Sequence, residues 1–250
     1  MEMYEVGGCI RDEILGIPSK DIDFTVVLAD TDPRWIGRDP FRYMADELRE
    51  MGFEIFLETP EYFTIRARFP RYSNGSGFVM RQEYSGMTAD FVLARKEGSY
   101  SDGRRPDRVE VGTLMDDLGR RDFTMNAIAK DAQGNLIDPF NGQQDIADRV
   151  IRAVGNARDR IIGEDALRGL RAIRFSVQKG FAVDQEVVDV LRSDEFKGAL
   201  RSVSTERQRE ELEKMFKIHT PMTLTIIHEL GLVYTLFNNT GLRLMPTMKG

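Results

Sequence analysis

The sequence predicts a mixed α+β domain over residues 1–145, followed by an all-helical domain over residues 146–250. Three observations lead to this fold class. Short runs with the two-residue period of strands alternate with helical segments in the first part of the chain, the strand pattern ends near residue 145, and apolar residues at helical spacing dominate afterwards. We therefore expect a mixed β-sheet with helices packed on it, and then a separate helical domain.

Apolar periodicity and turn residues predict the elements of the first domain. In chain order they are a strand at 3–6, a Gly-Gly turn, a short helix at 11–15, a buried strand at 22–28, a helix at 41–51, a half-buried strand at 63–69 and a strand that ends at 91–93. The pair Asn74-Gly75 predicts a turn. Residues 96–119 are rich in Gly, Pro, Asp and Arg and predict a long loop.

The second domain shows only helical patterns. An apolar stripe predicts its first helix, with Leu167, Leu170, Ile173 and Val177 on one face. Thr205 and Gln208 resemble a capping box at the start of a charged amphipathic helix. A last apolar helix is predicted over residues 224–236, interrupted at Gly231.

Composition excludes several classes of protein. The chain has 250 residues, 41% hydrophobic and 30% charged, and no apolar run reaches the length of a transmembrane span. Its single cysteine, Cys9, permits no internal disulfide and favours a reducing compartment, so we expect a cytoplasmic protein. Cys9 lies in an apolar stretch and is interpreted as a small packing residue. His219 and His228 lie apart from each other near the C-terminus, which disfavours a histidine-based metal or catalytic site.

The net charge of −6 does not by itself indicate a nucleic-acid-binding protein. The distribution of charge is more informative than the sum, because one segment of this acidic chain is rich in arginine. Its members are Arg149, Arg152, Arg158, Arg160, Arg168, Arg171 and Arg174. This segment is a local cationic stretch in an acidic chain, of a kind that can bind negatively charged groups.

Two motifs near the start indicate phosphate chemistry. Asp21 and Asp23 stand two residues apart in a predicted strand, so their carboxylates share one face, where a divalent cation such as Mg²⁺ removes their repulsion. Gly7 and Gly8 let backbone N–H groups approach a phosphate, and Arg11 can reach the same oxygens. Alone, each motif is also common in a solvated strand start or a plain turn. The combination at this spacing is far more specific.

A third carboxylate on a neighbouring strand is common in two-metal phosphoryl-transfer sites. Asp90, at the edge of a predicted strand, is the candidate, with a turn or surface aspartate as the alternative. In the segment "RRDFTMNAIA", Arg121 can pair with a triphosphate. Asp122 and Asn126 are four residues apart, so on a helix they share a face and can bind a ribose. The simpler reading of this segment is a helix start with an acid in its first turn.

The segment "GEDALRGLRAIRF" offers a way to read a nucleotide base. Asp165 and Arg168 are three residues apart, hence neighbours on a helix, and Arg171 and Arg174 continue the row. An acceptor beside a donor matches the amino group and ring nitrogen that cytosine and adenine both present. Guanine and uracil would leave groups unpaired at about 1–3 kcal/mol each. The alternative is a solvated face with an ion pair worth less than about 1 kcal/mol.

These residues resemble a known family. The chain is similar to the class II tRNA nucleotidyltransferases, the CCA-adding and poly(A) polymerase family of eubacterial type. The resemblance rests on five segments in family order, "VGGCIRDEILGIPSKDIDFTVV", "DDLGRRDFTMNAIA", "IDPFNGQQDIADRVIRAVG", "GEDALRGLRAIRF" and "VSTERQREELEKMF". It implies a polymerase β-like nucleotidyltransferase head with a mixed sheet, followed by a helical neck.

The resemblance also implies roles for the motif residues. Asp21 and Asp23 would bind magnesium, and Gly8 and Arg11 would lie at the triphosphate. Further nucleotide contacts would come from Arg121, Asp122, Asn126, Asp165 and Arg168, with Arg171 and Arg174 nearby. The predicted reaction is the addition of CMP and AMP from CTP and ATP to the 3′ end of tRNA.

The segment "RKEGSYSDGRRPDRVEVG" stands where the family has the flexible loop that helps to switch from C to A addition, which disfavours an enzyme that adds only cytidines. The family continues past the neck into body and tail domains, whereas this chain ends at Gly250, so it is expected to be a compact member or a truncated one. Rival readings are a poly(A) polymerase, a non-catalytic RNA-binding remnant and, less favoured, an enzyme that transfers nucleotides to a small molecule.

Overall fold

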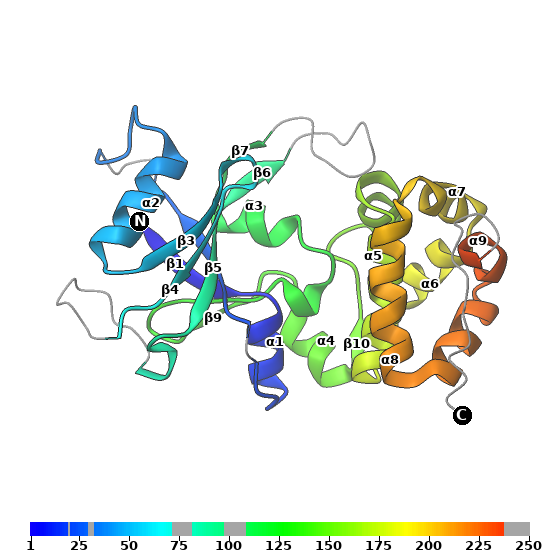
Figure 1. The fold of residues 1–250 in the computed structure, drawn as a ribbon. Coiled ribbons are helices and arrows are strands. Elements are labelled where there is room, and N and C mark those ends of the chain that lie inside the picture. The colour runs from blue at the N-terminus through cyan, green and yellow to red at the C-terminus, as the bar shows by residue number, and fades with distance from the viewer. Residues whose placement is uncertain (20, 30–32, 72–81, 98–108, 238–250) are drawn as a thin grey trace, which may run out of the picture. The chain divides into compact units, whose positions relative to one another are not determined.

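The computed structural model describes residues 1–19, 21–29, 33–71, 82–97 and 109–237 (Figure 1). The described residues up to 146 form one compact unit, and residues 147–237 belong to a second. The first unit contains a mixed sheet and the second is mainly helical. The predicted fold class is therefore confirmed.

Within the described residues, a seven-stranded mixed sheet forms the centre of the first unit. Its strands in spatial order are β3 (Glu54–Thr59), β4 (Thr64–Arg68), β5 (Thr88–Leu93), β2 (Asp23–Val27), β1 (Glu2–Val6), β8 (Ala129–Lys130) and β9 (Leu136–Ile137). β2 and β5 are parallel, and the other neighbouring pairs are antiparallel. The strands predicted at 3–6, 22–28 and 63–69 all form.

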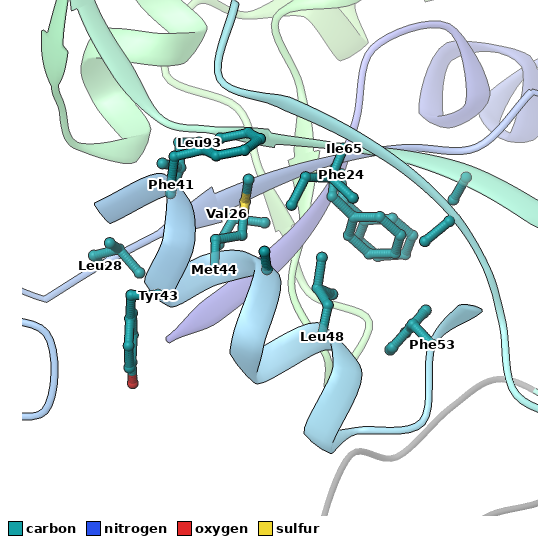
Figure 2. Close-up of a cluster of buried hydrophobic side chains, with 14 of the residues drawn as sticks. Phe24, Val26, Leu28, Phe41, Tyr43, Met44, Leu48, Phe53, Ile65 and Leu93 are labelled. Atoms are coloured by element: carbon teal, nitrogen blue, oxygen red, sulfur yellow. The ribbon is translucent and has the colours of Figure 1, made fainter. Parts of the chain in front are cut away.

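Alternation of side chains gives this sheet an apolar face and a polar face. Phe24 of β2 points into the core, where Phe91 of β5 stacks on it with ring centroids 5.1 Å apart. Helix α2 (Pro40–Glu50) covers this face with buried apolar side chains, as Figure 2 shows. Asp23 and Thr25, the odd-numbered neighbours on β2, point to the opposite face. The polar groups of the candidate site gather there.

The remaining elements of the first unit are short. They are α1 (Gly8–Ile14), α3 (Leu114–Gly119), α4 (Gly142–Asp148), the 3₁₀ turns η1 (Pro60–Tyr62), η2 (Gln82–Tyr84) and η3 (Thr124–Asn126), and a hydrogen-bonded pair of strands, β6 (Arg95–Glu97) and β7 (Val109–Val111). The long loop predicted over 96–119 is therefore wrong at both ends, because three-residue strands and a two-turn helix are too short to give a periodic pattern. Residues 98–108 and the predicted Asn74-Gly75 turn lie outside the described residues.

The second unit consists mostly of helices. Its elements are β10 (Val150–Ile151), the π-helical turn η4 (Asp159–Glu164), α5 (Leu167–Lys179), β11 (Ala182–Val183), α6 (Gln185–Arg192), α7 (Asp194–Ser202), α8 (Thr205–Glu229) and α9 (Val233–Phe237). The expectation of an all-helical domain is corrected by β10 and β11, which pair in parallel and are only two residues long. No helix in the described part of the chain is both long and apolar enough to cross a membrane.

Helix α8 differs from its prediction at its start and in its middle. Ser204 is the N-cap, no side chain caps the helix, and Thr205 is already helical, so the predicted capping box is wrong. Gln208 is fully buried and donates instead to the carbonyls of Leu200 and Val203. The helix is kinked at His219, whose backbone is not helical and whose Nδ1 accepts from the N–H of Met222.

Candidate active site

Three acidic side chains and one arginine line a cavity of about 420 Å³ in the first unit. The parallel register of β2 and β5 places Asp23 beside Asp90, and the antiparallel register of β4 and β5 places Arg66 opposite Asp90. Asp21 lines the same cavity. The registers of three strands therefore bring Asp23 and Asp90 together with Arg66, and Asp21 lies at the same cavity just before β2.

Two details of this acidic group differ from the prediction. Asp21 precedes β2, which begins at Asp23, so the two are not neighbours on one strand. Asp90 lies inside β5 rather than at the edge of a strand, and β5 itself is flanked by β2 and β4.

The surroundings of Asp23 disfavour the charged form of its carboxyl group. Burial raises the pKa of the Asp23 carboxyl, and the negative charge of Asp90 raises it further, while the positive charge of Arg121 opposes this rise. A divalent cation would relieve both effects, since it favours the charged form of a carboxylate. Without a cation the charged form of Asp23 is destabilised, so this carboxylate is well suited to bind a metal ion.

The acidic group does not enclose a metal by itself. Among the described residues, no group of three or more His, Cys, Asp or Glu side chains is arranged to hold an ion. Hard carboxylate oxygens around an open cavity do fit Mg²⁺, which takes one or two carboxylates and completes its octahedron with water and phosphate oxygens. The carboxylates of the cavity therefore fit a metal ion whose remaining ligands come from a bound phosphate group and water.

The Gly-Gly turn lies directly beside this acidic group. Gly7 has a φ of 78°, which disfavours any other residue, and α1 starts at Gly8. A Cβ atom on Gly7 would lie 2.9 Å from Nη1 of Arg121 and 3.8 Å from Oδ2 of Asp23. The missing side chain of Gly7 therefore makes room for the Arg121 guanidinium, next to the carboxylate predicted to hold the metal.

A buried carboxylate that the sequence analysis did not identify holds Arg121 in this place. Asp117 of α3 is fully buried, and its Oδ2 accepts from Arg121 at 2.9 Å and from the hydroxyl of Thr25 at 2.7 Å. Arg120 binds its other oxygen. The spacing of Asp117 and Arg121, four residues apart, was a signal for this pair.

Arg11, Asn126 and Asp122 form a second network. Arg11 is buried and donates to Oδ1 of Asn126 at 2.7 Å, and Nδ2 of Asn126 donates to Oδ1 of Asp122 at 3.0 Å. The prediction that Asp122 and Asn126 share a helix is wrong, because Asp122 lies in a bend and Asn126 ends the 3₁₀ turn η3. The two side chains nevertheless meet, and Arg11 joins them from α1.

In the second unit, Asp165 and Arg168 have separate partners. Asp165 is extended and precedes α5, so the prediction that both lie on one helix is wrong. The Asp165 carboxylate accepts from Arg207 at 2.6 Å and from the N–H of Leu167 at 3.1 Å. Arg168 pairs with Glu164 and donates to the carbonyl of Arg160 at 3.2 Å.

The arginine-rich segment is largely neutralised by acids of its own unit. Ion pairs join Arg152 with Asp184, Arg158 with Glu195, Arg160 and Arg168 with Glu164, and Arg174 with Glu211. Arg171 and Arg174 also lie over the ring of Phe175, at 5.5 and 4.1 Å from its centroid. The segment is therefore less cationic than its composition suggested.

Cys9 and the histidines have structural surroundings. The thiol of Cys9 is half-buried and donates to the carbonyl of Val6 at 3.1 Å, and burial raises its pKa. A thiol with a raised pKa is a poor nucleophile at neutral pH. His219 and His228 are exposed on α8. These positions agree with the packing and surface roles expected for them.

A model of the poly A polymerase head domain family matches residues 3–152. The chain belongs to this family.

Relatives of this head-domain protein are named as CCA-adding enzymes or CCA proteins. It is 36% identical to a CCA-adding enzyme of Geobacillus sp. (strain WCH70) over 234 residues, which are 92% of this chain and 50% of the relative. It is 34% identical to a multifunctional CCA protein of Actinobacillus pleuropneumoniae serotype 5b over 95% of this chain and 50% of the relative. The chain thus spans about half the length of these relatives.

Two solved structures of related enzymes have a fold similar to that of this chain. A Bacillus stearothermophilus CCA-adding enzyme in complex with CTP superposes with a TM-score of 0.73 at 28% identity, covering 96% of this chain and 50% of that one. A tRNA nucleotidyltransferase complexed with a primer tRNA and an incoming ATP analog gives a TM-score of 0.67 at 25% identity, covering 94% and 59%. The similarity extends well beyond the residues matched by the head-domain family.

Proposed function

We propose that the chain is a template-independent, Mg²⁺-dependent nucleotidyltransferase that adds CMP and AMP from CTP and ATP to the 3′ end of tRNA. In this reaction the RNA 3′-hydroxyl oxygen attacks the α-phosphorus, the bond to the β-phosphate oxygen breaks, and pyrophosphate leaves. Family membership and the CCA-adding names of the relatives support this reaction. We further propose that residues 1–145 are the catalytic head and residues 146–250 a neck that reads the base.

One observation carries the proposal. The Gly7 turn and the Asp23 carboxylate are adjacent, with 3.8 Å between a Cβ on Gly7 and Oδ2 of Asp23. A triphosphate seated on the turn would therefore meet the carboxylates that are predicted to bind the metal. This juxtaposition is what a phosphoryl-transfer site requires, because its catalysis is mainly positioning and charge neutralisation.

Several residues of the first unit would together bind the metal and the triphosphate. Asp21 and Asp23 would supply the metal's carboxylate ligands, and Asp90 is the candidate third catalytic carboxylate, which is not among those ligands. A Mg²⁺ ion held by these residues would lower the pKa of the attacking hydroxyl and stabilise the charge of the leaving pyrophosphate. Arg121 beside Gly7 would bind the triphosphate, with Gly8 and Arg11 at the same end of α1.

Asp122 and Asn126 would bind the ribose, and Asp165 and Arg168 would read the base, with Arg171 and Arg174 nearby. Arg207 and Glu164 hold the two base-reading side chains in defined positions, which supports such a role. Fixed donors and acceptors discriminate between bases better than mobile ones, because a mismatched base then leaves them unpaired. The cytoplasmic location expected from the sequence stays a prediction.

The experiment that tests the metal role uses tRNA lacking its CCA end, with CTP, ATP and Mg²⁺. We expect Asp21→Ala and Asp23→Ala to abolish nucleotide incorporation by at least about 10³-fold while circular dichroism shows a folded protein, since an electrostatic group at the reacting phosphate contributes on that scale. Arg49→Ala, on the exposed face of α2, is a control that should retain activity. Near-native turnover by either aspartate variant would contradict the proposal.

A poly(A) polymerase is the second candidate, favoured by the head-domain family that the chain matches. The same assay separates the two when products are read nucleotide by nucleotide. Extension that stops after CCA supports tRNA end addition, and a long A tail supports polyadenylation. No metal-dependent incorporation on any RNA would instead favour a non-catalytic RNA-binding protein.

A further inference from the structure

Arg66 binds both carboxylate oxygens of Asp90 inside the cavity. Arg66 Nε donates to Oδ1 and Nη2 donates to Oδ2, each at 2.6 Å. The antiparallel register of β4 and β5 sets the two residues opposite each other, so the backbone itself fixes the pair. Two parallel hydrogen bonds hold a carboxylate in one plane and make the pair specific. Asp90 is therefore oriented toward Arg66 by the sheet.

The pair changes the charge that a metal ion would meet. Asp23 lies beside Asp90 on the adjacent parallel strand, and Asp21 lines the same cavity. Arg66 balances one of these three negative charges and leaves two carboxylates for a cation. A cavity with three uncompensated carboxylates would bind a divalent cation more tightly, because affinity rises with the number of charged ligands.

We propose that Arg66 is a positioning residue that keeps Asp90 out of the metal's ligand set, so that Asp21 and Asp23 alone supply carboxylate ligands. This inference rests on the proposed function but concerns the affinity for the metal. A site with two carboxylates binds the metal weakly until triphosphate oxygens complete the coordination. Arg66 therefore couples the binding of metal to the binding of nucleotide.

The probe for this role is Mn²⁺ alone, without nucleotide, with its Kd measured by electron paramagnetic resonance titration of the full chain. Arg66→Met removes the two donors and the charge while keeping an unbranched side chain. We expect the Kd for Mn²⁺ to fall about tenfold, the scale on which groups around metal ligands change affinity. Asp90→Asn alone should weaken Mn²⁺ binding less than Asp21→Ala or Asp23→Ala, because it removes a nearby negative charge but no metal ligand.

A double-mutant cycle separates ligation by Asp90 from a simple field effect. Loss of a positive charge raises cation affinity whether or not Asp90 binds the metal. If Arg66 masks Asp90, Arg66→Met tightens Mn²⁺ binding strongly when Asp90 is present and much less in the Asp90→Asn background. Equal tightening in both backgrounds, or none in either, overturns the proposal.

Arg68→Met is the matched control. Arg68 lies two residues further along β4 and pairs with Glu54 at 2.9 Å, and it does not line the cavity. Its variant should bind Mn²⁺ like the wild type, and a shift as large as that of Arg66→Met would contradict the assignment. Arg66→Gln repeats the measurement if the methionine variant does not fold.

The same titration distinguishes this inference from the proposed function. Asp21→Ala and Asp23→Ala should each weaken Mn²⁺ binding. If both retain wild-type affinity, the proposed metal site itself is wrong. If both lose affinity while Arg66→Met changes nothing, only the role of Arg66 is wrong.

Discussion

At the scale of single residues, the first unit depends on a buried carboxylate that touches neither metal nor substrate in our proposal. Burial raises the pKa of the Asp117 carboxyl, but Arg121, Arg120 and the Thr25 hydroxyl outweigh burial and bring the pKa down to about 2. Asp117 thus stays charged at neutral pH and fixes Arg121 in the space that Gly7 leaves open.

We predict that Asp117→Asn destabilises the protein and weakens nucleotide binding. A pKa of about 2, below the ordinary 3.8, contributes stability above about pH 4 that is lost as the pH falls toward 2. The difference in unfolding free energy between the wild type and the variant should therefore be on the order of 2 kcal/mol at pH 6 and shrink below pH 4. Urea denaturation at a series of pH values measures it.

The same variant should raise the KM for CTP about tenfold, because Arg121 loses its anchor. Asp116→Asn is the control, since Asp116 lies on the same helix but caps it through Thr113. That control should lower stability by about 1 kcal/mol without changing the KM for CTP. A stability difference for Asp117→Asn that is constant from pH 6 to pH 2 would contradict the charge-based explanation.

At the scale of elements, close packing between helices positions the proposed base-reading residues. Gly169 lies on α5, next to Arg168, and a Cβ there would lie 2.4 Å from ring atoms of Phe196 and 2.7 Å from Leu191. These contacts come from α7 and α6, so α5 can approach both helices only because residue 169 lacks a side chain. The sequence showed an apolar stripe on α5 but not this requirement.

We predict that Gly169→Ala lowers the stability of the protein by about 1–3 kcal/mol, because the added methyl group overpacks this contact. Gly198→Ala is the matched control. Gly198 lies in helix α7 and a Cβ there meets nothing within 4 Å, so alanine should stabilise the helix by about 0.5–1 kcal/mol. Thermal unfolding of both variants would test the pair, and opposite signs are expected. Equal shifts of the same sign would contradict this packing argument.

At the scale of the whole molecule, the proposed roles divide between the two units. The acidic cavity, the Gly7 turn and Arg121 belong to the first unit, whereas Asp165 and Arg168 belong to the second. Each group is held by partners of its own unit, Arg121 by Asp117 and Arg168 by Glu164. Metal binding and base choice should therefore respond to different substitutions.

We predict that Arg168→Ala reduces the preference for CTP and ATP over GTP and UTP about tenfold, because one fixed donor is lost. Its affinity for Mn²⁺ without nucleotide should equal that of the wild type. Arg152→Ala removes an exposed arginine of the same segment, paired with Asp184, and should leave the nucleotide preference intact. Values of kcat/KM for the four nucleotides test this. Unchanged ratios for Arg168→Ala would contradict a base-reading role.

The sequence by itself determined the features that depend on short-range periodicity. The strands at 3–6, 22–28 and 63–69 and the helix at 41–51 were predictable because side chains alternate on a strand and recur every 3.6 residues on a helix. The family was also within reach, because its motifs are local strings of residues in a fixed order. The sequence did not predict strands of two or three residues, such as β10 and β11, because such short elements contain no repeating pattern.

The tertiary structure decided which of the candidate residues meet. Asp23, Asp90 and Arg66 share one row of the sheet only through the registers of β2, β5 and β4, and no spacing along the chain contains a register. Likewise the partner of Asp165 is Arg207, 42 residues away, rather than its helical neighbour Arg168. The sequence named the charged groups, but the pairing of charges depends on distances between strands and helices that only the folded chain sets.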